Sequence, residues 1–334
     1  MKIKFLRFAF VLLLMMTAVS TVMSQTSRYI TIWDSRESSE RPGNSNTTIA
    51  LNTAGTNYSV YYEKVGVPTV NGTINNINSS IGHPYVLSVP SEGEYRIEAY
   101  DGNGKLERLY MSPVEEKKYD NKRLKEVVQY GTTKWAYLNN AFRDAENMEV
   151  SASIDKPDLS RTNTLQSMFH GCSKMTYPNP NIGEWDVSNI TDMSWLFCKA
   201  KRFNQNINNW NVSNVTKMPA MFSEAEVFNQ PLNWNVSKVT EMQSMFFKAT
   251  NFDQDLSRWN VSNVQKMQDM FNSALKFNSD LKDWNVGNVV DMTAMFFNAK
   301  AFNRDLSKWN VSNVVSMAGT FQGAEAFTSD LSTS

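Results

Sequence analysis

The sequence is poor in cysteine and histidine and carries no excess of charge. Its 334 residues include two cysteines, Cys172 and Cys198, and two histidines, His83 and His170. So few residues exclude a disulfide-built scaffold or a cysteine-rich zinc cluster, and they leave little for histidine-based catalysis. Basic and acidic side chains number 33 each, so the net charge is zero. That balance removes the electrostatic case for nucleic acid as the main partner.

Long apolar runs are also scarce, and the longest lies at the N-terminus. Three basic residues lead into an unbroken apolar run of nine residues at 8–16. Nine residues are too few for a membrane span, which needs roughly 20. Small-residue cleavage sites follow at 18–20 and at 22–24. We therefore expect a signal peptide at 1–24, cleaved after Ser24, and a secreted or cell-surface chain without a transmembrane segment.

An internal repeat dominates the rest of the chain. Six tryptophans are spaced 25, 24, 25, 25 and 25 residues apart, namely Trp185, Trp210, Trp234, Trp259, Trp284 and Trp309. Around each, the chain runs close to W-N-V-S-N-V-x-x-M-x-x-M-F-x-x-A-x-x-F-N-x-D-L-S-x. This predicts about eight coils of about 25 residues at 141–334. A single coil cannot bury its own apolar side chains, so the copies should stack on a shared core.

The spacing inside one copy predicts both strand and helix. Residues 256–264 follow the L-x-x-L-x-L pattern of a leucine-rich repeat, with Trp259 and Val261 pointing inward from a short strand and Asn260 outward. From Val264 to Ala274 the apolar residues recur every three or four positions, which is helical or 3₁₀ spacing. A strand at 252–256 is an open alternative. The expected fold class is a mixed α/β repeat, a leucine-rich-repeat-type solenoid.

The segment before the repeats has a different texture. Residues 27–118 contain several short β-rich runs with turns about every ten residues, which predicts a small antiparallel sandwich domain. Between this domain and the repeats, residues 119–140 are expected to form a short connecting helix, at 119–130, and an entry segment that leads into the first coil.

Residues 130–334 resemble the BspA-like leucine-rich-repeat surface proteins of bacteria. The segments that carry the match are MFFKATNFDQDLSRWNVSNVQKM at 245–267 and MFFNAKAFNRDLSKWNVSNVVSM at 295–317. The resemblance implies an exported surface protein whose array follows a small immunoglobulin- or PKD-like β-sandwich. It also implies adhesion to extracellular-matrix proteins or to other bacteria. The W-G-D-G-type turn of such modules is missing, since residues 61–66 read YYEKVG.

Candidate chemical sites are few. Asp255, Asp280, Asp305 and Asp330 form one column, but one carboxylate per coil cannot supply the six to eight oxygens that calcium needs. We expect no metal, no cofactor and no catalytic residues. Cys172 falls at the alanine position of the repeat, which indicates a small core residue. A disulfide between Cys172 and Cys198, one coil apart, is possible in an exported protein.

The outward positions beside each inward tryptophan and valine form the candidate binding face. The residue directly before each tryptophan differs between coils, whereas the residue directly after it is nearly always asparagine. Variation is what specific recognition requires. We expect a non-enzymatic, monomeric, adhesin-like protein that binds an extracellular protein or glycan, with a structural spacer as the alternative. The face comprises Asn209, Asn211, Asn233, Asn235, Arg258, Asn260, Asp283, Asn285, Lys308 and Asn310.

Overall fold

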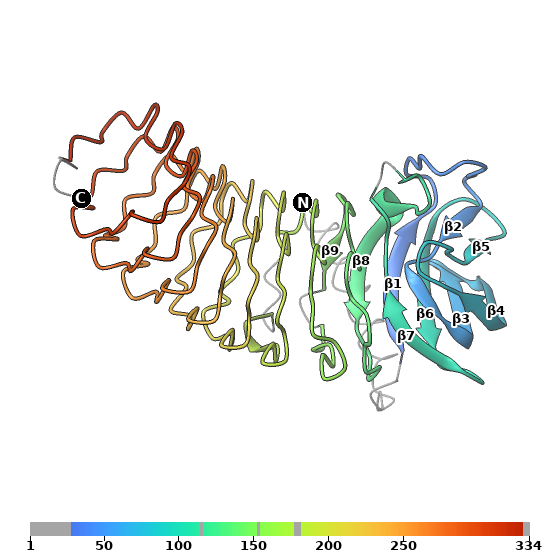
Figure 1. Ribbon diagram of the computed structural model, residues 1–334. Coiled ribbons are helices and arrows are strands. Elements are labelled where there is room, and N and C mark those ends of the chain that lie inside the picture. The colour runs from blue at the N-terminus through green and yellow to red at the C-terminus, as the bar shows by residue number, and fades with distance from the viewer. Residues whose placement is uncertain (1–27, 114–115, 152–153, 177–181, 330–334) are drawn as a thin grey trace, which may run out of the picture.

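The molecule is elongated, with a β-sheet domain at one end and stacked coils running away from it (Figure 1). The computed structural model describes residues 28–113, 116–151, 154–176 and 182–329, so the expected signal peptide at 1–24 lies outside it. The described strands are β1 (Tyr29–Asp34), β2 (Thr48–Ala50), β3 (Thr53–Lys64), β4 (Val67–Ser79), β5 (Val86–Ser88), β6 (Glu94–Tyr100), β7 (Lys105–Leu109), β8 (Leu124–Gln129) and β9 (Glu149–Val150).

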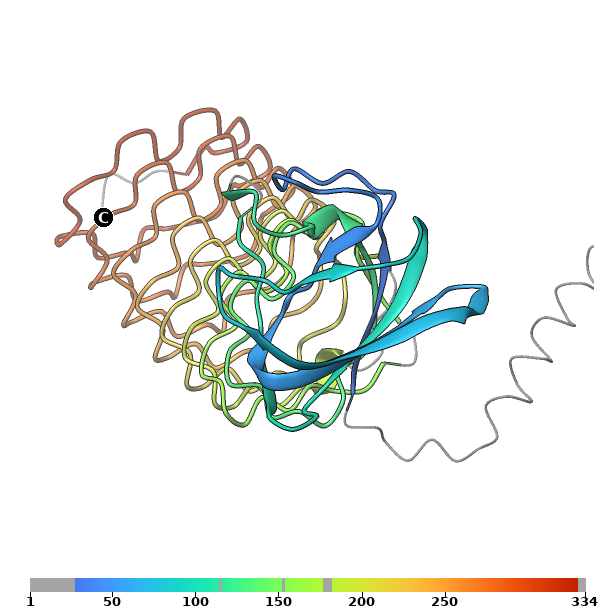
Figure 2. The ribbon, with the colours of Figure 1, turned by 90° about the vertical axis from the view of Figure 1, so that its right-hand side faces the viewer.

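The sheet of the N-terminal domain continues into the coils. Seven strands form one sheet in the order β4-β3-β6-β1-β8-β9, with β7 also paired to β3, while β2 and β5 pair separately. Strand β8 is antiparallel to β1 on one side and parallel to β9 on the other. Seen end-on, the domain lies across the first coils (Figure 2). It therefore covers the N-terminal end of the stack.

The predicted fold class is wrong. The described residues contain no α-helix, and their only assigned helical elements are two three-residue 3₁₀ turns, η2 (Asn121–Arg123) and η3 (Ile182–Glu184). The protein is nearly all β, so it is not a mixed α/β leucine-rich-repeat solenoid behind a separate immunoglobulin/PKD-like sandwich. The short connecting helix expected at 119–130 is also absent, because η2 and β8 occupy that segment.

Consecutive turns produce the spacing that suggested a helix. In the coil around Phe271, alternate amides donate to carbonyls of the next coil, namely Met267 to Asp291, Asp269 to Thr293, Phe271 to Met295 and Ser273 to Phe297. The amides between them donate three residues back, namely Met270 to Met267, Asn272 to Asp269 and Ala274 to Phe271. Each turn brings an apolar side chain back to the core after three or four residues. This is also the repeat of an α-helix, so the pattern cannot separate the two structures.

Each coil places two residues in the left-handed region of backbone space. In eight successive copies both positions have φ between 51° and 75°. The first set is Asn140, Ser167, Trp195, Ala220, Ser244, Asp269, Ala294 and Gly319, and the second is Asp144, Gly171, Lys199, Glu224, Lys248, Ser273, Asn298 and Gly323. A residue with a Cβ atom is strained there by about 1–2 kcal/mol. The strain persists because the neighbouring coils fix the amides of these turns.

We expect Ser244→Gly to raise the free energy of unfolding by up to about 1 kcal/mol, because relief of left-handed strain exceeds the added chain entropy of glycine. Ser244 has φ 56°. Urea denaturation measures the difference. Ser257→Gly is the matched control, since Ser257 is exposed and lies outside the left-handed set. The control should be no more stable than the natural chain, and an equal gain in both variants would contradict the strain argument.

Aromatic side chains form continuous columns through the core. In one column, the rings of Phe142, Phe169, Phe197, Phe222, Phe246, Phe271, Phe296 and Phe321 follow one another at 5.5–5.8 Å between centroids. Each buried tryptophan from Trp210 onward donates its indole N–H to a carbonyl of the preceding coil, as Trp259 does to Leu232 at 2.7 Å. The core is therefore shared between coils, and each indole hydrogen bond fixes the position of one coil relative to the coil before it.

A buried polar network holds the segment between β1 and β2 onto the domain. Asp120 and Arg123 have side-chain exposures of 0% and 1%, and their charged atoms lie 3.7 Å apart. Asp120 accepts the amide N–H of Ala50 at 2.7 Å and pairs with Arg41 at 3.2 Å. The guanidinium of Arg123 donates to the backbone carbonyls of Glu37, Ser45 and Thr48. Every strong polar group in this network thus has a partner, as burial requires.

Candidate functional site

The asparagines that directly follow the tryptophans of the predicted face are exposed, but their side chains stabilise turns. Each Oδ1 accepts the amide N–H two residues further on at 3.1–3.2 Å. These asparagines are Asn211, Asn235, Asn260, Asn285 and Asn310. The interaction is a local side-chain turn of the kind that asparagine favours. Each of these side chains therefore bonds within its own coil.

Other asparagines form the ladder between coils. At the position after the second phenylalanine, the side-chain oxygen accepts the amide N–H of the equivalent residue in the next coil at 2.9–3.1 Å. The acceptors are Asn204, Asn229, Asp253, Asn278 and Asn303. The last residue of W-N-V-S-N forms a second ladder through its Nδ2, as Asn263 does to the Ser237 carbonyl at 2.7 Å. These side chains therefore contribute to folding, because they join neighbouring coils.

The variable column is the part of the predicted face that the turns do not use. Its members Asn209, Asn233, Arg258, Asp283 and Lys308 are all exposed. An ion pair joins two of them, with Lys308 Nζ at 2.6 Å from Asp283 Oδ1. The hydrogen bond from Lys308 and its positive charge lower the pKa of the Asp283 carboxyl. This column presents amides, one anion and two cations in a fixed order along the stack.

A shallow cavity of about 330 Å³ lies on the same face. Arg258 and Asp255 line it together with Asn233, and the rings of Trp234 and Trp259 form part of its wall. Both tryptophans are almost fully buried, and polar and apolar atoms contribute about equally to the accessible lining. The cavity is therefore a shallow mixed surface in which Asn233, Asp255 and Arg258 supply the hydrogen-bonding groups.

The aspartate column stabilises turns. Asp255, Asp280 and Asp305 each accept the amide N–H two residues further on, at 2.8–3.0 Å, while Asp330 lies outside the described residues. Hydrogen bonds from Ser257 lower the pKa of Asp255. Within the described ranges, no group of three His, Cys, Asp or Glu side chains converges as a metal site would.

Both cysteines are buried and free, so the possible disulfide is absent from this structure. The Cys172 thiol donates to the Phe142 carbonyl at 3.1 Å, and its side chain fills the alanine position of its coil. Burial raises the pKa of Cys172 well above the usual value and raises that of Cys198 to about 11. Thiols in such surroundings are poor nucleophiles.

We expect neither thiol of the folded protein to react with iodoacetamide at pH 7, because burial blocks access and keeps both groups protonated. In urea both should react. Mass spectrometry counts the added groups. A chain that takes up none even in urea without reductant would contain the disulfide, contrary to the structure.

A charged column that sequence reasoning missed follows the parallel bridges between coils. Residues of alternating sign are bridged in order, namely Asp192, Lys217, Glu241, Lys266 and Asp291. Lys266 Nζ lies 3.5 Å from Glu241 Oε2. A hydrogen bond from Gln243 and the charges of the two neighbouring lysines lower the pKa of Glu241. Opposite charges in adjacent coils favour the observed register, and their alternation every 24 or 25 residues is visible in the sequence.

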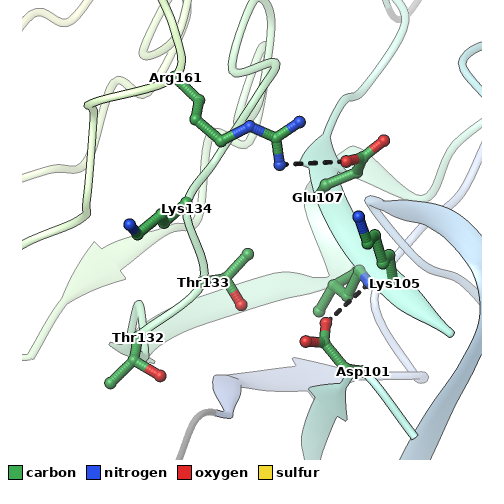
Figure 3. A pocket seen from close by; sticks show the side chains of 8 residues that line it. Asp101, Lys105, Glu107, Thr132, Thr133, Lys134 and Arg161 are labelled. Atoms are coloured by element: carbon green, nitrogen blue, oxygen red, sulfur yellow. Dashed lines mark hydrogen bonds and ion pairs between the residues drawn. The ribbon is translucent and has the colours of Figure 1, made fainter. Parts of the chain in front are cut away.

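A second groove, of about 220 Å³, marks the junction between the domain and the coils. Figure 3 shows Arg161 reaching across it to Glu107 on β7, with Thr132, Thr133 and Lys134 along one side. Arg161 Nη1 lies 3.2 Å from Glu107 Oε2, and Asp101 accepts the Leu106 amide N–H at 2.9 Å. Both carboxylates thus have partners within the protein, and the ion pair across the groove links β7 to the coils.

The comparisons with known proteins give one family. A family model described as "Mycoplasma protein of unknown function, DUF285" matches residues 136–233 and 232–334, two tandem matches that cover the coils. No curated protein and no solved structure matches the chain. Among the helices that the structure describes, none is long and apolar enough to cross a membrane.

Proposed function

Because the chain belongs to the family described as "Mycoplasma protein of unknown function, DUF285", whose description assigns no activity, we propose a function from the exposed surface of the coils. The protein is an exported, non-enzymatic surface protein that binds an extracellular protein or glycan. The variable column, Asn209, Asn233, Arg258, Asp283 and Lys308, makes the central contacts. The resemblance to BspA-like surface proteins and the basic and apolar start of the chain support export.

One observation carries the proposal. Five successive coils expose Asn, Asn, Arg, Asp and Lys at the same position, while the asparagines that follow each tryptophan repeat and accept hydrogen bonds in turns. Selection for folding alone explains the repeated asparagines, because each accepts a hydrogen bond from its own turn. Folding uses the pair of Lys308 with Asp283, but it does not require an arginine at the same register position, Arg258. A partner with complementary polar groups would use that order.

The shape of the surface suits a macromolecule. A column along stacked coils is extended and rigid, since neighbouring backbones are hydrogen-bonded at every coil. Extended surfaces of repeat proteins contact long or flat partners at several points at once. Each exposed charge contributes little alone, so affinity requires several contacts together.

We expect the triple variant Arg258→Ala, Asp283→Ala, Lys308→Ala to lose at least tenfold in affinity for its partner, because it removes all three charges of the column. Surface plasmon resonance with the full chain over immobilised extracellular-matrix proteins and glycans measures saturable binding. The matched control is Lys201→Ala, Glu226→Ala, Lys300→Ala, which removes three charges from another exposed column. Both variants should unfold at the same temperature as the natural chain.

The alternative is a structural spacer that only projects another module. It is favoured by the regularity of the coils, whose repeated polar residues are occupied in turns and ladders. A spacer would show no saturable binding in the same experiment. If a partner binds and the variable-column triple variant retains full affinity, the binding surface lies elsewhere on the chain.

A further inference from the structure

Trp195 stands apart from every other tryptophan of the coils. It occupies the first left-handed position of its coil, with φ 55°, where the other copies have Asn, Ser, Ala, Asp or Gly. It is 41% exposed, whereas the repeat tryptophans are at most 5% exposed. Within the part of the chain that the structure describes, no ring packs against its indole. Aromatic stacking therefore does not explain a large side chain at a strained, partly exposed position.

A polar cavity of about 270 Å³ adjoins this indole. Five of its six lining residues are polar, and they come from three successive coils joined by backbone hydrogen bonds. The lining residues are Asn140, Arg143, Gln166, Ser167, His170 and Trp195. Asn140 donates its amide N–H to the Gln166 carbonyl, and Ser167 donates to that of Ser194, so the walls are held by the coil ladder.

The charged groups of the cavity balance one another. His170 Nδ1 lies 3.1 Å from Asp144 Oδ1, and Arg143 Nε lies 3.5 Å from Asp144 Oδ2. Since a carboxylate only accepts hydrogen bonds, Nδ1 of a neutral His170 carries the proton and Nε2 is an acceptor. Arg143 Nη1 donates to Asn140 Oδ1 at 3.4 Å. Asp144 thus offsets Arg143, and the cavity favours an uncharged ligand.

We propose that this cavity binds one neutral hexopyranose ring of a glycan. A pyranose has an apolar C–H face, which the exposed indole of Trp195 can cover, and a rim of hydroxyl groups. The amides of Asn140 and Gln166 can donate and accept, His170 Nε2 accepts and the guanidinium of Arg143 donates, so together they offer the donors and acceptors that hydroxyl groups require. A cavity of about 270 Å³ is below the size of drug-sized pockets, which fits a single ring.

The site is separate from the variable column and is independent of the function proposed above. The column residues lie before the repeat tryptophans, whereas the cavity residues belong to the bridge and turn segments of the first coils. The Arg258, Asp283, Lys308 triple variant should therefore retain sugar binding. If sugar binding is absent while the variable column still binds its partner, only the proposal for the cavity fails. If sugar binding is present and the column binds no partner, only the function proposed above fails.

Isothermal titration of the full chain with the methyl glycosides of glucose, galactose, mannose and N-acetylglucosamine tests the proposal. We expect at least one to bind saturably with a Kd near or below about 1 mM, which corresponds to about 4.1 kcal/mol. Trp195→Ala should weaken binding at least tenfold. Leu275→Ala is the matched control, because Leu275 is also an exposed apolar residue of the coils and does not line the cavity. It should bind normally.

Trp195→Gly separates binding from folding. Glycine adopts φ 55° without strain, so this variant should melt no lower than the natural chain and still lose sugar binding. The proposal is overturned if none of the four glycosides binds, or if Trp195→Gly retains full affinity. It is also overturned if only the methyl glycoside of glucuronic acid binds, since that result requires an anion site.

Discussion

Phe277→Ala should lower the free energy of unfolding by about 3–5 kcal/mol, the usual loss for a fully buried phenylalanine. Phe277 is 0% exposed, and its ring lies 3.9 Å from that of Phe271 and 6.0 Å from those of Phe252 and Phe302. Truncation leaves a cavity that touches three coils, and hydrogen-bonded backbones on both sides prevent collapse into it. Chemical denaturation monitored by circular dichroism measures the change.

Phe327→Ala is the matched control at the last described position of the same column. Among the described residues its ring stacks on those of Phe302, at 6.0 Å, and Phe321, at 4.2 Å, and it is half-buried. We expect less than half the loss found for Phe277→Ala. Equal losses at the two positions would mean that the coils do not share one core.

Asp120→Ala should lower the free energy of unfolding by about 3–5 kcal/mol, because it leaves the buried guanidinium of Arg123 without its anion. It also removes the acceptor of the Ala50 amide N–H and the partner of Arg41. The segment between β1 and β2 should then lose its attachment to the domain. Thermal unfolding gives the loss of stability, and limited proteolysis of that segment reports its release.

Glu37→Ala is the control for Asp120→Ala in the same segment. Its carboxylate pairs with Lys125 at 3.1 Å, and both side chains are about one-third exposed. Such pairs contribute about 0–1 kcal/mol, and the Glu37 carbonyl that Arg123 binds is kept. If Asp120→Ala is as mild as Glu37→Ala, the buried network does not hold the domain together.

The repeat made much of the core predictable. Tryptophan, valine, methionine, phenylalanine and alanine recur at fixed positions, and from Trp185 to Phe302 the residues at those positions are buried. A side chain that recurs every 25 residues must meet the same surroundings in each copy, so burial follows from the sequence. The expected β-rich runs of the N-terminal domain likewise overlap described strands, for example Tyr58–Tyr62 within β3.

The backbone path between those side chains was not predictable. Apolar spacing of three and four is common to an α-helix and to successive turns, and only the acceptors of the amides distinguish them. Left-handed residues such as Lys248 and Glu224 gave no signal, because glycine and asparagine are the usual markers of that conformation. The pair of Asp120 with Arg123 is local in sequence, but its burial depends on the segment between β1 and β2 closing over it.

The candidate site was predictable in part. Exposure of the variable column follows from its place beside an inward tryptophan. The repeated asparagines were assigned to the same binding face, although the turns use their side chains. Trp195 carried a signal that could have been read, since it lies ten residues after Trp185 and is out of register with the other six. A residue that departs from a regular array is a better guide to recognition than one that follows it.

The most direct test of the coil geometry is the scalar coupling transmitted through backbone hydrogen bonds, measured by NMR on the deuterated full chain. The structure predicts that the amide nitrogen of Phe271 couples to the carbonyl carbon of Met295, and that of Ser273 to the carbonyl of Phe297. An α-helix would instead couple Phe271 to Met267, four residues back. Observation of that helical coupling would contradict the account of stacked turns sharing one core.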